Sequence, residues 1–104
     1  MNITVQKLDE MRRSGEAHTL LDVREDDELA IASLDGALHI VMNTIPDNLD
    51  KLPKDKPIVI MCHGGGRSAQ VQMWLNANGY DNAVNLEGGI HAWSTMIDPL
   101  VPKY

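Results

Sequence analysis

The sequence has one cysteine in 104 residues, and this scarcity excludes several kinds of protein. A single thiol cannot form an internal disulfide framework, a multi-cysteine metal site or a C-x-x-C redox motif. Aromatic residues are also scarce, at 4% with no phenylalanine, so we expect a core of leucine, isoleucine, valine and methionine. Composition alone leaves the thiol of Cys62 either an inert core group or a reactive group without a cysteine partner.

Basic charge and long apolar runs are lacking as well. The net charge is −6 and no Lys/Arg stripe is visible, which argues against nucleic-acid binding. No stretch approaches the ~20 apolar residues of a membrane span, and the first residues lack the apolar segment of a signal peptide. We therefore expect a cytoplasmic protein with no membrane contact, in which the thiol stays reduced. Acidic residues concentrate in the run Glu25–Glu28, which is typical of a solvated helix face.

What is present fits one globular domain over residues 1–104. The chain is 43% hydrophobic and 23% charged, as in ordinary soluble domains. Pro99 and Pro102 indicate that residues 97–104 form a poorly ordered C-terminal tail. His18, His39 and His91 show no ligand spacing, so we expect no metal and no cofactor.

Strand-like and helix-like segments alternate along the chain. Short apolar runs predict strands at Thr19–Val23, Ala37–Val41, Ile58–Met61 and Ala83–Leu86, with Ile3–Val5 as a candidate edge strand. Helical spacing and end signals predict helices at Gln6–Arg13, Glu25–Ala32, Pro46–Leu52, Ser68–Asn78 and Ile90–Met96. The pattern predicts the α/β class, with a small, mainly parallel sheet of about five strands flanked by helices on both faces. Ligands of such sheets bind beyond the carboxyl ends of the strands, where Cys62 lies.

The loop Cys62-His63-Gly64-Gly65-Gly66-Arg67-Ser68 joins the predicted central strand to the clearest predicted helix. Three glycines indicate a need for positive φ or for a close approach of backbone amides. Amides at a helix N-terminus form an anion cradle, which favours a thiolate over a thiol. Arg67 adds a permanent positive charge, so Cys62 is a candidate nucleophile with a lowered pKa. The alternative is a small buried hydrophobe at a strand end.

The pattern Cys-x4-Arg-Ser between a strand and a helix resembles the active-site loop of a rhodanese domain. Leu20-Leu21-Asp22-Val23-Arg24-Glu25 is similar to that family's upstream signature, and Gly36-Ala37 follows at the expected distance. Residues 85–93, which end in Gly-Gly-x-x-x-Trp, resemble its last motif. The resemblance covers about residues 3–93 in the usual order and is to the single-domain form. Residues 32–35 depart from the usual Gly-His-Ile-Pro, from which we expect a local structural change and no loss of catalysis.

The resemblance implies a sulfurtransferase. Its cysteine takes a sulfane sulfur from a small anionic donor such as thiosulfate and passes it to a thiophilic acceptor such as cyanide or a thiol. Cys62 would carry the persulfide as the catalytic residue. By similarity, His63, Gly64, Gly65, Gly66 and Arg67 would form the substrate-binding cradle, and Arg67 would favour the anionic donor or the persulfide. His63 either supports the thiolate or substrate, or is simply exposed.

Two alternatives remain open from the sequence. The acidic run 25–28 could dock a basic protein, which would make the chain a persulfide carrier or interaction module with a protein sulfur acceptor and little turnover of small molecules. A Cys-dependent phosphatase or arsenate reductase is the weaker alternative, since those enzymes use a Cys-x5-Arg loop one residue longer. Outside the loop, we expect a structural ion pair of Arg24, for instance with Glu28, and core or helix-packing positions for Trp74 and Trp93.

Overall fold

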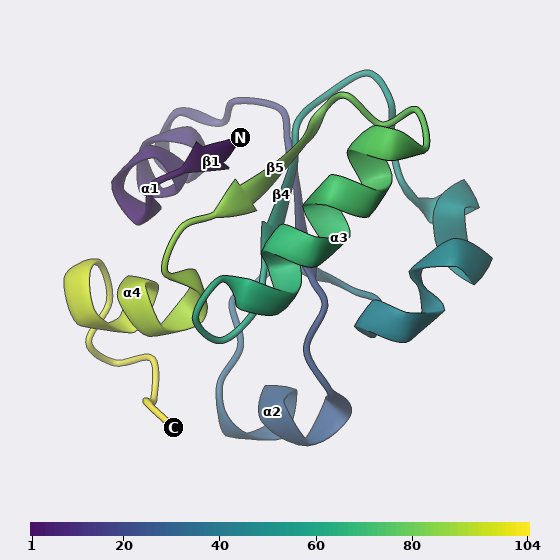
Figure 1. Cartoon of the computed structure of the whole chain (residues 1–104). Coiled ribbons are helices and arrows are strands. Elements are labelled where there is room, and N and C mark those ends of the chain that lie inside the picture. The colour runs from purple at the N-terminus through teal and green to yellow at the C-terminus, as the bar shows by residue number, and fades with distance from the viewer.

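The computed structural model describes all residues 1–104, and five parallel strands form its centre (Figure 1). The strands, in the sheet order β1-β5-β4-β2-β3, are β1 Asn2–Ile3, β5 Ala83–Leu86, β4 Ile58–Met61, β2 Thr19–Asp22 and β3 Leu38–His39. The helices are α1 Val5–Ser14, α2 Asp26–Ile31, the 3-10 segment η1 Met42–Lys51, α3 Gly66–Ala77 and α4 Gly89–Met96. This architecture confirms the predicted α/β class.

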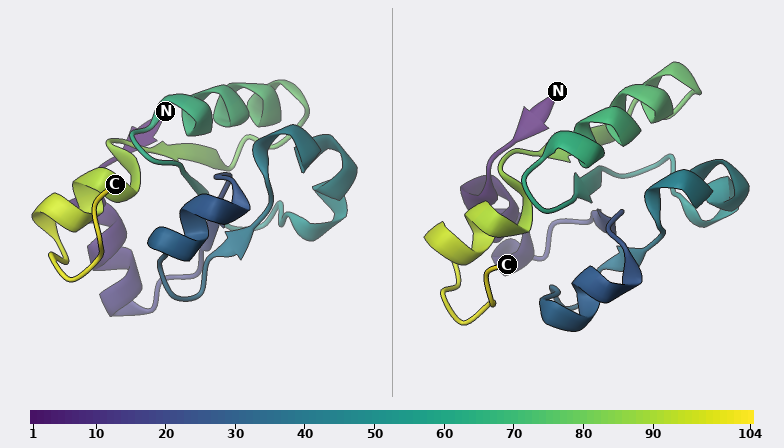
Figure 2. Two further views of the ribbon diagram at one scale, coloured as in Figure 1. Left: turned by 90° about the horizontal axis from the view of Figure 1, so that it is seen from below. Right: turned by 60° about the horizontal axis from the view of Figure 1, so that its bottom comes forward.

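Helices cover both faces of the sheet, as Figure 2 shows from two further directions. Side chains of α1 and α4 pack with one set of strand residues, and side chains of α3 and η1 pack with the other set. Alternation along β4 divides its residues between the two cores: Val59 and Met61 face α1 and α4, while Ile58 and Ile60 face α3 and η1. All four β4 residues are buried, which fits the predicted central strand.

Local signals in the sequence explain most helix ends. The Thr4 hydroxyl accepts a hydrogen bond from the Lys7 amide at 3.1 Å and caps α1. Gly15 ends the same helix with φ +74°, the left-handed conformation predicted for that glycine. Val5 was expected in an edge strand but opens α1, where it is buried, so β1 is shorter than predicted.

The predicted helix at Pro46–Leu52 was placed too late in the chain. The segment starts at Met42, is a 3-10 helix, and is interrupted at Asn48, whose φ of −126° is not helical. The Thr44 hydroxyl donates to the Val41 carbonyl at 2.8 Å, and the Asn48 amide donates to the Thr44 carbonyl at 2.8 Å. These side-chain bonds compete with the regular backbone hydrogen bonds of an α-helix, and the spacing of apolar residues does not predict such competition.

The prediction of a poorly ordered tail was wrong. Val101 is buried in the core beside α4, and the Ser94 hydroxyl donates to its carbonyl. The chain then runs on to Tyr104, whose side chain reaches residues after β2 and β4. Proline ended the helix here without loosening the segment. No helix combines the length and the hydrophobicity that crossing a lipid bilayer requires.

Candidate active site

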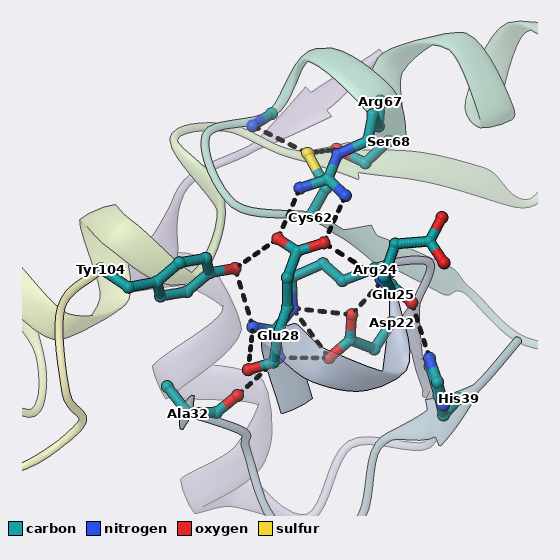
Figure 3. A network of polar contacts seen from close by, with 11 residues as sticks. Asp22, Arg24, Glu25, Glu28, Ala32, His39, Cys62, Arg67, Ser68 and Tyr104 are labelled. Carbon is teal, nitrogen blue, oxygen red and sulfur yellow. Dashed lines mark hydrogen bonds and ion pairs between the residues drawn. The ribbon is translucent and has the colours of Figure 1, made fainter. Parts of the chain in front are cut away.

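The predicted site lies at the carboxyl edge of the sheet. There Arg24 follows β2, Cys62 follows β4 and Gly88 follows β5, while α2 and the C-terminal tail border the same edge (Figures 1 and 3). The parallel pairing of these three strands brings their ends together. Segments far apart in the sequence therefore meet around one thiol.

The thiol of Cys62 is held by the first turn of α3. Its side chain is 1% exposed, and its Sγ accepts a hydrogen bond from the Gly65 amide at 3.0 Å, with the Ser68 hydroxyl oxygen at 3.3 Å. Burial disfavours the thiolate, but hydrogen bonds from Ser68, Gly65 and Arg67 outweigh burial and lower the pKa of Cys62. The positive end of α3 acts in the same direction. The predicted lowering of the pKa is thus reproduced by the geometry.

Two glycines shape this loop by different means. Gly65 has φ +108°, which turns its amide toward the sulfur. A Cβ on Gly89 would overlap the carbonyl oxygens of Cys62 and His63, and those carbonyls accept hydrogen bonds at 3.0 Å from Ile90 and His91 in the first turn of α4. Gly64 and Gly66 have neither a positive φ nor a neighbour that a Cβ would meet. Only one of the three consecutive glycines therefore needs its conformational freedom.

Arg67 lies in the first turn of α3, one residue before the predicted start of that helix, and its guanidinium is already paired. Both terminal nitrogens donate to the Glu28 carboxylate of α2, at 2.6 and 2.8 Å (Figure 3). The hydrogen bonds from Arg67 lower the pKa of Glu28 to about 2, against the opposing effect of burial. The acidic run is therefore not a uniformly solvated face, since its last carboxylate is 16% exposed and bound to the candidate loop.

Tyr104 ties the tail to this ion pair. Its hydroxyl donates to Glu28 at 2.8 Å and accepts from Arg24 at 2.9 Å. Its ring stacks on His63 with a centroid distance of 4.3 Å, and His91 meets His63 edge-on at 5.7 Å. His63 is thus half-buried beneath the tail rather than freely exposed.

The predicted structural ion pair of Arg24 exists, with a different partner. Arg24 and Asp22 are both fully buried, and Arg24 donates to the two Asp22 oxygens at 2.9 and 2.7 Å. Glu28 contributes only its backbone carbonyl to Arg24, at 3.5 Å. A further bond from Arg24 to the Ala32 carbonyl, at 2.8 Å, fixes the end of α2. The pair holds α2 against the sheet edge.

Comparison with known proteins agrees with this arrangement. Residues 4–96 match the profile of the rhodanese-like domain. The chain belongs to the rhodanese family. It is 39% identical over 97 residues to the putative sulfurtransferase YtwF of Bacillus subtilis, with 93% of each chain covered. It is 42% identical over 89 residues to a rhodanese-like/PpiC domain-containing chloroplast protein of Arabidopsis thaliana, covering 82% of this chain and 30% of that protein.

The solved structures point to the same fold. A rhodanese-like domain protein from Staphylococcus aureus superposes with a TM-score of 0.85 at 40% identity, covering 99% of this chain and 97% of that one. The rhodanese domain seen here thus has the five-strand parallel sheet of its relatives. Because relatives at this level of identity carry the name sulfurtransferase, a transferase of the rhodanese type is the activity class that fits this chain.

The structure brings Cys62, His63 and the residues up to Arg67 together, and three further residues contact them. From the sequence, Glu28 was expected only in the docking run or as a partner of Arg24, and Tyr104 and Asn85 had no expected role, although all three contact residues 63–67. Only Asn85 carries a signal, since it is a polar residue inside the buried strand β5 of a rhodanese domain. Of the two tryptophans, Trp93 is buried in the core, while Trp74 of α3 is 38% exposed.

Proposed function

We propose that this rhodanese domain transfers a sulfane sulfur through a persulfide on Cys62. The observation that supports it is the Cys62 sulfur itself, bonded by the Gly65 amide at the start of α3. The lowered pKa of Cys62 supplies a nucleophilic thiolate. With one cysteine in the chain, no second thiol competes for the sulfur.

The reaction proceeds as a double displacement. The Cys62 thiolate attacks the outer sulfur of thiosulfate, the S–S bond of the donor breaks, and sulfite leaves with the bonding electron pair. The product is a Cys62 persulfide anion, for which the loop amides of residues 63–67 supply the cradle. Cyanide or a thiolate then attacks the outer sulfur, and the Cys62 thiolate is released. Charge and sulfur balance in both steps.

The experiment is intact mass analysis after incubation with thiosulfate. We expect a gain of one sulfur atom, its removal by cyanide, and formation of thiocyanate. Because Cys62 is the only cysteine, the adduct needs no mapping, and Cys62→Ser is the matched control that must show neither signal. Absence of the adduct in the unaltered chain would refute the persulfide mechanism.

A protein acceptor is a second candidate, favoured by the surface of α2. Glu25, Asp26 and Asp27 are exposed beside the Glu28–Arg67 pair and present negative charge to a basic partner. Stable persulfide loading without cyanide turnover, followed by discharge to a basic acceptor protein, would support it. Asp26→Asn with Asp27→Asn should then slow the discharge, and an unchanged rate would count against this acceptor surface.

Phosphoryl transfer is less well supported. A phosphate group needs the two nitrogens of the loop arginine, and in this structure Glu28 occupies both. Four residues separate Cys62 from Arg67, which encloses a smaller ring than a tetrahedral oxyanion requires. Hydrolysis of an aryl phosphate by the unaltered chain would favour phosphoryl transfer over sulfur transfer.

A further inference from the structure

Behind the candidate nucleophile, a chain of polar groups runs from the Cys62 sulfur through Ser68 and Asn85 to the Gly65 carbonyl. Ser68 is fully buried, Asn85 is 5% exposed, and the Ser68 hydroxyl oxygen contacts both the Cys62 sulfur at 3.3 Å and the Asn85 side-chain oxygen more closely. The Asn85 nitrogen donates to the Gly65 carbonyl at 3.3 Å. Buried groups of this kind must be satisfied within the protein, so their protons can be assigned one by one.

The Gly65 carbonyl fixes the orientation of the Asn85 amide. If the amide were flipped, its oxygen would face the Gly65 carbonyl, which is another acceptor, and would find no proton there. The Gly65 carbonyl itself also accepts from the Ala69 amide at 3.1 Å. The Asn85 oxygen therefore faces Ser68 and must accept from it, as a side-chain amide oxygen has no proton to give. A serine hydroxyl has a single proton, so Ser68 cannot donate to Asn85 and to Cys62 at once.

We propose that Asn85 is a positioning residue that holds the Ser68 proton away from the Cys62 sulfur and so favours the thiol over the thiolate. While Cys62 is a thiol, its S–H donates to Ser68, Ser68 donates to Asn85, and Asn85 donates to Gly65. Every group in this chain is then satisfied. When Cys62 loses its proton, Ser68 must either turn toward the sulfur and leave the buried Asn85 oxygen unpaired, or present a lone pair to the anion. Either choice costs about one hydrogen bond.

The competition for the Ser68 proton follows from the structure alone, whereas its benefit for catalysis rests on the proposed function. The loop amides and α3 make the thiolate easy to form, and a very acidic thiol is a weaker nucleophile. By opposing them, Asn85 keeps the Cys62 thiolate basic enough to attack a donor sulfur. The residue would thus balance the amount of thiolate against its reactivity.

Several other charged or titratable groups surround the thiol. They come from the loop, α2, α3, α4, the end of β2 and the tail: His63, Glu28, Arg67, His91, Asp22, Arg24 and Tyr104. None of them contacts the Asn85 side chain, whose bonds run to Ser68 and Gly65. A change confined to Asn85 therefore leaves their charges in place. It also removes the bond to the Gly65 carbonyl, and a Ser68→Ala background separates that loss from the effect of the Ser68 proton.

The test titrates the Cys62 thiolate in Asn85→Leu, which matches the size of the side chain and accepts no hydrogen bond. Thiolate absorbance in the ultraviolet is followed against pH, with Cys62→Ser as the blank and the pH profile of iodoacetamide alkylation as a second measurement. We expect about fivefold more thiolate than in the unaltered chain on the acid side of the titration, the equivalent of one hydrogen bond. Asn85→Ala should act in the same direction and serves where the leucine variant does not fold.

The control is the same substitution in a Ser68→Ala background. With the hydroxyl gone there is no proton to compete for, so Asn85→Leu should no longer move the titration. A titration unmoved by Asn85→Leu, moved toward higher pH, or moved equally in the Ser68→Ala background would overturn the proposal. These measurements need no sulfur transfer, so a failure to load sulfur from thiosulfate would refute the proposed function and leave this inference standing.

Discussion

Glu28→Gln is the substitution that tests how far the α2 carboxylate stabilises the fold. Glutamine keeps the length and shape of the side chain but removes the charge that Arg67 neutralises. The lost interaction is bidentate, with both nitrogens of Arg67 within 2.8 Å of the carboxylate. Of charge-assisted hydrogen bonds, this geometry is the strongest kind. We expect a clear loss of stability at neutral pH.

The magnitude follows from the pKa of Glu28. A fall from 4.5 to about 2 corresponds to about 3 kcal/mol of folding free energy if it is expressed in full. The Arg67 side chain is 36% exposed, however, and solvent screens a pair of this kind. We therefore expect Glu28→Gln to lower the free energy of unfolding by about 1–2 kcal/mol at neutral pH.

The pH dependence has a defined sign. Because the folded pKa of Glu28 lies below the unfolded one, the stabilisation is complete above 4.5 and is lost as the pH falls toward about 2. Urea unfolding at about pH 7 and about pH 3 should show the difference in free energy of unfolding between the two proteins shrinking to well under half at the lower pH. Asp27→Asn is the matched control, an exposed carboxylate of the same run that forms no ion pair. If Glu28→Gln has the same free energy of unfolding as the unaltered chain at neutral pH, or if the difference is equally large at about pH 3, the reasoning is refuted.

Three further predictions concern the same edge of the sheet. Gly89→Ala should unfold the chain or lower its free energy of unfolding by more than about 3 kcal/mol, because the new Cβ meets two carbonyl oxygens. Gly15→Ala, with a positive φ but open space, is the control and should lower it by only about 1 kcal/mol in thermal unfolding. Tyr104→Phe should lower the free energy of unfolding by about 1–3 kcal/mol, since it leaves one nitrogen of the buried Arg24 with only its long bond to the Glu28 carbonyl, at 3.5 Å; full stability would show that water replaces the hydroxyl. In steady-state assays, Glu28→Gln should lower the KM for thiosulfate severalfold by freeing the loop guanidinium for the dianion, and a raised KM would show that the carboxylate positions that guanidinium for substrate.

The sequence predicted the central sheet and the nucleophile loop well because both depend on local signals. β4 and β5 have the predicted bounds, since short, mostly apolar runs are distinct from the polar and turn residues beside them. Cys62 was placed by its position after β4 and before an amphipathic helix. Gly15 ended α1 where the sequence indicated. Each of these inferences needed only residues close in the chain.

The parts that were missed depend on contacts between distant segments. Tyr104 and Glu28 are 76 positions apart in the sequence, and Arg67 and Glu28 are 39 apart, so no local pattern predicts either contact. The acidic run looked uniform in the sequence because periodicity cannot tell which of its carboxylates faces the loop. The tail was misjudged for the same reason: its prolines are visible, but the burial of Val101 is a tertiary property.

The pairing of Arg67 changes what the site offers to a donor. A free guanidinium would attract a small dianion strongly, whereas one held by Glu28 presents little net charge, and the exposed carboxylates beside it on α2 repel anions. In the proposed reaction, donor binding would therefore rely on the amide cradle around Cys62, whose dipoles act at short range. An anion gains from these dipoles only after it has shed water and entered the loop. Substrate specificity at this site would thus depend on whether the sulfur-bearing group fits the cradle more than on the overall charge of the donor.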